Sequence, residues 1–513
     1  MHFVKISLLI FLMISSLCSL SSCGSSPFHQ KGPGLDLRER VQRVVLDNGM
    51  TFLLLKREGA PVFSAQIKVR VGNIEEEAGS RGLAHFFEHM AFKGTSKIGT
   101  TDGKKEKEIL DQIFEVGTQI VEMRKAGKKP EEYAHLVARR KALEEQQKEL
   151  IVPNEFHHIY QANGGIGLNA STSNDFTTYF ISLPANKLEL WAYLESARFT
   201  DPFMRDFFTE VNVVAEERKM RIDNPPIGSM YETFVDLAFN EPNPYKTVVI
   251  GPAEDIQNYT PKVAQAFYDR YYIPSRMVAT LVGNFDMDEA KRVIKKYFSK
   301  LPSHDDQNKK FATTTFDDTF PRQQTIYRED KPRFFFGYHR PAHPDPDDII
   351  LDVVQHILCH GRTSRLYKEL VLEERKAVSI SCYSAFPGAR LDSLFLFHGM
   401  PHDGVSNKEL KDLTLGIVNK LAQEGPSEQE LQKVINNIDA SLIYSLESNS
   451  GLADSLAHFE SLTGDWEYIY DWQKRVKQIK ATDIQRVIKK YFVPNREVTV
   501  FMERKVEGGK NDE

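Results

Sequence analysis

The sequence lacks the features that mark several large classes of protein. Its 66 lysine and arginine residues are balanced by 71 aspartate and glutamate residues, so the net charge of −5 gives no sign of nucleic-acid binding. It contains neither a G-x-x-x-x-G-K-[ST] phosphate-binding loop nor a glycine-rich dinucleotide fingerprint. With 513 residues, 41% of them hydrophobic, the chain is long enough for two or more domains with cores of their own. This composition is typical of a large soluble enzyme.

The most informative motif is H-x-x-E-H, formed by His85, Glu88 and His89. On a helix these positions share one face, so two imidazoles and a carboxylate converge. Two histidines at this spacing are a zinc-binding pair, and a glutamate that is not a ligand can act as the base for a metal-bound water. The motif is the inverted form of the H-E-x-x-H signature of metalloproteases. The five residues alone also fit an ordinary helix with solvated side chains.

The surrounding pattern predicts a helix that directly follows a sheet. Residues 41–46 and 50–56 form a predicted hairpin around an Asp-Asn-Gly turn. Alternating apolar residues over 61–71 predict a half-buried strand. The helix that carries the motif is then expected to begin after Ser80 as N-cap and to end before Gly94.

A catalytic zinc site needs a third protein ligand and an open position for water. Residues 207–221 have a helical pattern with Glu210 and Glu217 about two turns apart on one face, whereas Glu216 points elsewhere. The spacing does not decide which carboxylate binds a metal.

Three segments, 72–95, 169–179 and 210–217, together resemble the pitrilysin/insulinase family of zinc metallopeptidases, in its mitochondrial-processing-peptidase-like branch. The resemblance extends from about residue 38 to residue 505. It implies one Zn²⁺ per chain bound by His85, His89 and Glu217, with Glu88 as general base. Glu210 matches a glutamate that supports the site without binding the metal.

The resemblance also implies residues that contact substrate. Asn169 and Ala170 match a strand segment that touches the substrate backbone, and Arg390 aligns loosely with a substrate-contacting arginine. A second H-x-x-C-H pattern, His356, Cys359 and His360, has the same layout, but its apolar surroundings favour a core helix.

The fold implied by the resemblance is α+β, with two homologous units that each pack a mixed, mostly antiparallel sheet against helices. Matched endings, Tyr-Tyr-Ile-Pro-Ser-Arg at 271–276 and Tyr-Phe-Val-Pro-Asn-Arg at 491–496, indicate that the second unit is a degenerate copy of the first. The expected boundaries are a catalytic domain at 38–300, a linker at 301–318, a substrate-chamber domain at 319–505 and a polar tail at 506–513.

One departure from the family is the long separation between His89 and Glu217. The excess fits within 101–163, where two helical runs flank an Ala-Gly-Lys-Lys-Pro turn. We therefore expect an inserted helical hairpin, which acts as a lid or docking arm or is simply a tolerated insertion.

The N-terminus has the pattern of an exported lipoprotein. Residues 1–22 read as a signal peptide, and Leu-Ser-Ser-Cys23 resembles a lipoprotein cleavage box with Cys23 as the lipidated residue. An ordinary signal peptide with an incidental cysteine is the alternative. A Gly/Ser/Pro tether follows over 23–37. Only Cys359 and Cys382 then remain in the body, and a disulfide between them is possible but unsupported by the sequence.

The sequence thus predicts a zinc-dependent endopeptidase that hydrolyses peptides or unfolded segments. The alternative is a non-catalytic, lipid-anchored peptide-binding or assembly subunit on the same fold. The family implies four such units around a chamber, so we expect the chain to pair with itself or with a zinc-less homologue. The expected location is a bacterial envelope membrane, with the outer membrane favoured.

Overall fold

The computed structural model describes residues 37–127, 131–303, 306, 311 and 320–505. The predicted signal peptide, Cys23, most of the tether, most of the linker and the polar tail lie outside these residues. A single-turn 3₁₀ helix, η1 (Leu37–Glu39), belongs to a unit that ends at Arg40, and all the other elements belong to a second unit that starts at Val41.

The first half of the second unit is built on a six-stranded sheet. Its strands, in the order β1-β2-β6-β3-β5-β4 across the sheet, are β1 (Gln42–Val45), β2 (Thr51–Lys56), β3 (Val62–Val69), β4 (Ile166–Thr172), β5 (Thr177–Pro184) and β6 (Met277–Gly283). Its helices are α1 (Leu83–Met90), α2 (Gly103–Lys125), α3 (Glu131–Lys148), α4 (Glu155–Ala162), α5 (Leu188–Thr200), α6 (Phe207–Arg218), α7 (Pro226–Ala238), α8 (Ala253–Gln257), α9 (Pro261–Tyr271) and α10 (Met287–Phe298).

The second half is built on a five-stranded sheet. Its strands, in the order β7-β11-β8-β10-β9, are β7 (Arg322–Arg328), β8 (Arg333–Arg340), β9 (Ala377–Phe386), β10 (Ser393–Pro401) and β11 (Glu497–Arg504). Its helices are α11 (Asp347–Cys359), α12 (Asn407–Glu424), α13 (Glu428–Glu447), α14 (Asn449–Thr463), α15 (Tyr468–Val476) and α16 (Ala481–Tyr491).

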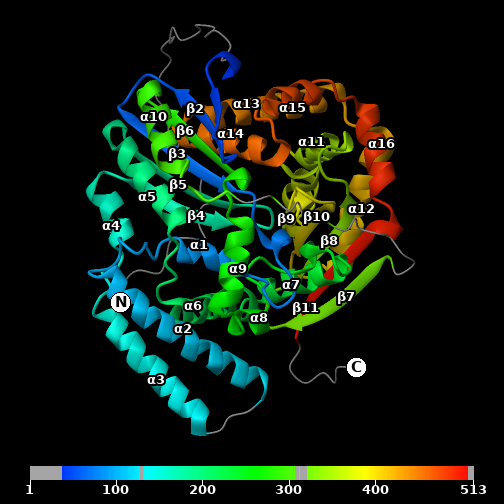
Figure 1. Ribbon diagram of the computed structural model, residues 1–513. Coiled ribbons are helices and arrows are strands. Elements are labelled where there is room, and N and C mark those ends of the chain that lie inside the picture. The colour runs from blue at the N-terminus through cyan, green and yellow to red at the C-terminus, as the bar shows by residue number, and fades with distance from the viewer. Residues whose placement is uncertain (1–36, 128–130, 304–305, 307–310, 312–319, 506–513) are drawn as a thin grey trace, which may run out of the picture. The chain divides into compact units, whose positions relative to one another are not determined.

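The two sheets have the same topology, apart from the additional edge strand β1. In each, the last strand in sequence lies second or third in the sheet and pairs in parallel with one neighbour, β2 or β7. All the other pairs are antiparallel. The matched sequence endings lie at equivalent places, where α9 leads into β6 and α16 leads into β11. The predicted α+β fold with two related parts, here the two halves of the second unit, is therefore confirmed (Figure 1).

Each half sends one helix onto the sheet of the other half. Helix α7 packs on β7 and β11, where Phe234 is buried against the ring of Phe335. Helix α14 packs on β3 and β6 (Figure 1). There, Gln66 Nε2 donates a hydrogen bond to Asp454 Oδ1 over 2.8 Å. The expectation that the strand at 61–71 is half-buried is consequently wrong, because α14 covers the face that carries its polar residues.

The hairpin predicted over 101–163 corresponds to α2 and α3, which pack on each other. Glu106 of α2 is fully buried and receives a hydrogen bond of 2.6 Å from Arg205 Nε and one of 3.0 Å from Gln147 of α3. This ion pair attaches the hairpin to the loop that leads into α6. That the hairpin is an insertion relative to the family stays a prediction.

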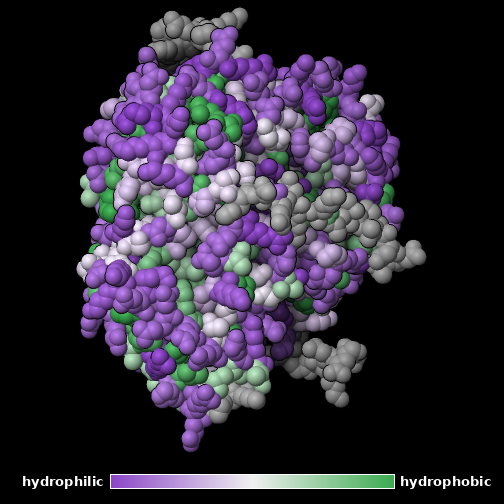
Figure 2. Space-filling model, in the orientation of Figure 1, coloured by the Kyte–Doolittle hydropathy of each residue, from purple (hydrophilic) through white to green (hydrophobic). Residues whose placement is uncertain are grey.

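Among the described residues, no helix is both long and apolar enough to cross a membrane. On the face drawn in Figure 2, hydrophilic residues predominate and hydrophobic ones are scattered among them. Such scattered apolar residues are usual on protein surfaces.

Candidate active site

The motif helix α1 is held at its N-terminus by a carboxylate. Its N-cap is Gly82 at φ +95°, a backbone conformation that favours glycine. The carboxylate of Glu76 accepts hydrogen bonds from the amides of Gly82 (2.6 Å) and Ala84 (2.8 Å). The expected cap is therefore wrong, because the Ser80 hydroxyl donates to the carbonyl of Glu77 instead. Burial raises the pKa of Glu76 to about 8, although the two amide hydrogen bonds favour its charged form.

His85 and His89 of α1 and Glu217 of α6 converge on one point. Glu217 Oε2 lies 3.7 Å from His85 Nε2 and 3.3 Å from His89 Nε2. The ligand atoms of all three residues lie within 4.8 Å of one another, and no other such group of three occurs in the described part of the chain. A tetrahedral ion with bonds of about 2.1 Å holds its ligands about 3.4 Å apart. The donor set and its spacing therefore fit a zinc ion.

Glu210, the second candidate carboxylate, does not face this point. Its Oε1 lies 2.8 Å from His89 Nδ1, and its Oε2 accepts a hydrogen bond of 2.6 Å from Lys93 Nζ. A carboxylate at Nδ1 leaves Nε2 of His89 directed at Glu217, which is the orientation that a metal-binding histidine needs. The structure thus gives the two glutamates different positions, which the spacing alone could not do.

Burial and mutual hydrogen bonds shift the pKa of each group in the cluster. Burial and the neighbouring His89 lower the pKa of His85 to about 4. Burial opposes the charge of His89, but its hydrogen bonds to Glu210 and Glu217 raise its pKa to about 9. Burial opposes the charge of Glu210 and Glu217 as well, but the hydrogen bond and the charge of His89 help to lower the pKa of both carboxyls. Glu210 and Glu217 then face three cations, because Lys93 pairs with Glu210 and Arg221 pairs with Glu217 beside the imidazolium of His89. Binding of a metal at His89 Nε2 would displace a proton from that imidazole.

Glu88 lies beside the cluster without joining it. Its Oε2 accepts a hydrogen bond of 2.6 Å from the hydroxyl of Thr172, at the end of β4. Burial raises the pKa of Glu88, and the hydrogen bond from Thr172 partly offsets this shift. A carboxylate with a raised pKa is a better proton acceptor and donor near neutral pH.

Strand β4 is an edge strand of the first sheet, so one side of its backbone has no strand partner there. Asn169 is exposed and pairs in register with Phe180, and Ala170 pairs with Tyr179. An edge strand is where an extended peptide can add by backbone hydrogen bonds. The predicted substrate role of Asn169 and Ala170 fits this position and stays a prediction.

Arg390 lies at a contact between the two halves. Its Nη1 is 3.1 Å from Glu75 Oε1 and donates to the carbonyl of Asp175 over 2.9 Å. Its side chain is 12% exposed. The predicted substrate contact of Arg390 stays a prediction, and these partners would compete for its guanidinium group.

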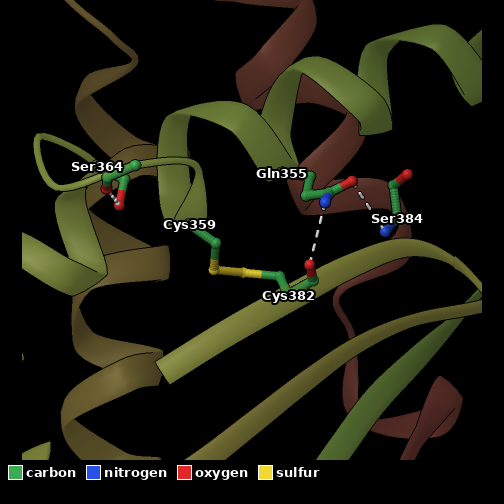
Figure 3. The surroundings of a disulfide bond; sticks show 6 residues. Gln355, Cys359, Ser364, Cys382 and Ser384 are labelled. Carbon is green, nitrogen blue, oxygen red and sulfur yellow. Dashed lines mark hydrogen bonds between the residues drawn. A yellow bond between two sulfur atoms is a disulfide. The ribbon is translucent and has the colours of Figure 1, made fainter. Parts of the chain in front are cut away.

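Cys359 of the second H-x-x-C-H pattern is bonded to Cys382 of β9, which answers the question that the sequence left open (Figure 3). The two Cα atoms are 5.7 Å apart, an ordinary separation for a disulfide. Because the sulfur is bonded, it offers no thiolate to a metal.

Three further residues support the site: Lys93, Thr172 and Arg221. Arg221 Nη2 lies 2.9 Å from Glu217 Oε1, the carboxylate oxygen that points away from the histidines. The sequence contains one weak signal for Lys93, a cation near the C-terminus of the motif helix. It contains another for Arg221, because Glu217 and Arg221 are four residues apart on one predicted helical run. It contains none for Thr172, because that contact depends on how β4 meets α1.

We predict that Lys93→Met weakens zinc binding by about 10- to 100-fold, the range found when groups that orient metal ligands are removed. The ion pair with Lys93 fixes Glu210, and Glu210 in turn orients His89. Zinc affinity is measured by competition with a chromogenic chelator, which does not depend on turnover. Lys97→Met, an exposed lysine on the following loop, is the matched control. Equal affinity in both variants would exclude this role for Lys93.

Comparison with known proteins places these features in one family. The model of the insulinase family (peptidase family M16) matches residues 51–113, and that of the peptidase M16 inactive domain matches residues 258–438. The second match begins near the end of the first half and covers much of the second half. The metal-ligand cluster found among the described residues lies in the first half.

Individual relatives agree with this assignment. The zinc protease PqqE of Helicobacter pylori is 28% identical over 471 residues, which cover 90% of this chain and 92% of that protein. A crystal structure of a protease from Helicobacter pylori has a TM-score of 0.75 and 26% identity, and the match covers 90% of this chain and 99% of that one. The structure of the periplasmic protease PqqL from Escherichia coli has a TM-score of 0.65 and 19% identity, with 91% of this chain and 48% of that chain covered. The two family models and these relatives therefore support the insulinase family of peptidases, family M16, as the family of this chain.

Proposed function

We propose that the chain is a zinc-dependent endopeptidase that hydrolyses peptides or unfolded segments. The observation that carries the proposal is the convergence of His85, His89 and Glu217 beside Glu88. The zinc-protease names of the relatives support it. Zn²⁺ bound by these three side chains would polarise a water molecule and the carbonyl group of the substrate.

The chain's own groups supply the proton transfers and the positioning. The Glu88 carboxylate takes a proton from water and passes it to the leaving amine. Thr172 holds Oε2 of that carboxylate and so fixes its direction. Backbone groups at the edge of β4 hold an extended substrate, which favours peptides and unfolded segments over folded proteins.

The test is hydrolysis of unstructured, internally quenched peptides by the purified protein. We expect cleavage that a chelator abolishes and that stoichiometric Zn²⁺ restores. Cleavage that continues after the metal content has fallen to zero would overturn the zinc mechanism. A protein with full zinc content that binds peptides but cleaves none would support the alternative, a non-catalytic peptide-binding or assembly subunit. The presence of Glu88 argues against that alternative, because peptide binding does not require a base.

Export from the cytoplasm is part of the proposal. It is supported by the signal-like pattern of residues 1–22 and by the disulfide, since disulfides persist in oxidising compartments. The relative PqqL is described as periplasmic. A lipid anchor at Cys23, with the outer membrane as its location, is the finer proposal. Replacing Cys23 with Ser should move the protein from the membrane fraction to the soluble fraction of disrupted cells, and a soluble wild type would contradict the anchor.

The active assembly is proposed to contain four units of this fold around a chamber, formed by two copies of the chain or by the chain with a zinc-less homologue. Each chain contributes two units, of which one carries the metal-ligand cluster in the described residues. Sedimentation and peptidase activity measured on one sample test this, and a monomer that cleaves folded proteins as readily as peptides would contradict it.

A further inference from the structure

The two faces of edge strand β4 look toward different parts of the molecule. Residues paired across antiparallel strands lie on the same face of a sheet. Thr172 reaches Glu88, so its face, which also carries the buried Ala170, is directed toward α1. Ile166, Asn169 and Ser171 lie on the opposite face, opposite Ser182, Phe180 and Thr178 of β5. A substrate strand added to β4 would present its side chains alternately to the motif helix and to this second face.

The second face of β4 borders a cavity of about 600 Å³. Strands β3, β4 and β5 form its floor, and α14 forms its far wall. Part of the polar lining is buried, including Ser64, Gln66 and Lys68. Lys68 pairs over 3.4 Å with Asp454 of α14, whose side chain is 62% exposed. Two large apolar side chains stand near the sheet edge, Ile166 at 74% exposure and Phe180 at 37%. The side of the cavity next to β4 therefore carries two large apolar side chains, and the side formed by α14 carries the exposed Asp454.

Reach decides which of these residues a substrate side chain can touch. Neighbouring strands lie about 4.8 Å apart, so a strand added to β4 would lie about 10 Å from β5 and about 14 Å from β3. Asn169 lies between such a strand and Phe180. A phenylalanine or leucine side chain can pass beside Asn169, over the small flanking residues Gly167 and Ser171, and meet the ring of Phe180. The Lys68–Asp454 pair, whose lysine stands on β3, is out of reach for the same side chain.

We propose that Phe180 and Ile166 form a subsite for a large apolar side chain of the substrate. The inference rests on the proposed peptidase function. Phe180 pairs with Asn169, which is three residues from Thr172 along β4. At about 3.3 Å per residue, the subsite lies about 10 Å along the strand from the hydroxyl that holds Glu88. The side chain that it binds is therefore about three residues from the scissile bond.

The experiment compares peptides that differ only by Phe or Ala at each position from two to four residues on either side of a single cleavage site. For the wild type, kcat/KM should be about tenfold higher with Phe at one of these positions, the lower end of the range for filling an apolar pocket. Phe180→Ala should reduce this preference to near unity, and Phe180→Leu should keep most of it. Tyr193→Ala, which removes an aromatic residue of similar exposure on α5, should leave the preference unchanged.

The outcomes separate the subsite from the function on which it rests. Cleavage by the wild type without any preference for Phe, or a preference that survives in Phe180→Ala, would overturn the subsite alone. Failure of the zinc-loaded wild type to cleave any of the peptides would overturn the proposed function and the subsite with it. The melting temperature of each variant shows whether the fold is retained, and Phe180→Leu provides the test if Phe180→Ala does not fold.

Discussion

Glu88→Gln is expected to lower kcat by about 10²- to 10⁴-fold, the usual contribution of a general acid–base group, while zinc content and melting temperature stay near the wild-type values. A glutamine side chain has nearly the same shape and can still accept the hydrogen bond from Thr172 through its amide oxygen. It cannot take a proton from water near neutral pH. The measurements are steady-state hydrolysis of an unstructured peptide and zinc analysis of the same preparation.

The matched control is Glu77→Gln, an exposed glutamate that pairs with Arg270 over 3.4 Å. This variant should hydrolyse the peptide at the wild-type rate. If Glu88→Gln were as active as Glu77→Gln, Glu88 would not be the base. If it lost its zinc, the residue would have a role in metal binding that its position beside the cluster does not indicate.

Glu217→Ala is expected to lose both the metal and the activity. The change removes one of three converging ligand groups, so zinc affinity should fall by more than about 100-fold, beyond the range seen for residues that only orient ligands. It also leaves the Arg221 guanidinium, 2.9 Å from the carboxylate in the wild type, without that partner. Zinc content after dialysis and affinity from chelator competition measure the effect directly, and peptide hydrolysis should be undetectable at stoichiometric zinc.

Glu216, the residue before Glu217, offers a matched control. Glu216 lies on the same helix, is exposed, and pairs with Lys219 over 2.7 Å. Glu216→Ala should keep its zinc and its activity. If Glu217→Ala retained stoichiometric zinc and Glu216→Ala did not, the third ligand would be Glu216 and the assignment of Glu217 would be wrong.

Local patterns predicted the elements of the site well, because helices and strands are determined largely by short-range periodicity. The hairpin around Gly49, the strand that became β3, and the helix that carries His85 and His89 are all present. The matched chain endings also revealed the repeat, since each marks the entry into an equivalent strand.

One error arose in a short loop, and the others arose where distant parts of the chain meet. The cap of α1 is the carboxylate of Glu76, which reaches the helix through a loop whose path the sequence does not specify. Strand β3 is buried on both faces because α14, hundreds of residues later, covers it. The same reason explains why the distinct positions of Glu210 and Glu217 and the bond between Cys359 and Cys382 needed the structure.

The exchange of α7 and α14 between the two halves has a consequence for how this chain can be divided. Produced alone, the first half would leave the face of β3 and β6 that α14 covers open to water, and α7 would lose strands β7 and β11 and the ring of Phe335 that packs on Phe234. The second half alone would expose the face of β7 and β11 that α7 covers, and α14 would lose strands β3 and β6. Fragments cut at the linker are therefore expected to aggregate when made separately, and to become soluble when both are synthesised in the same cell.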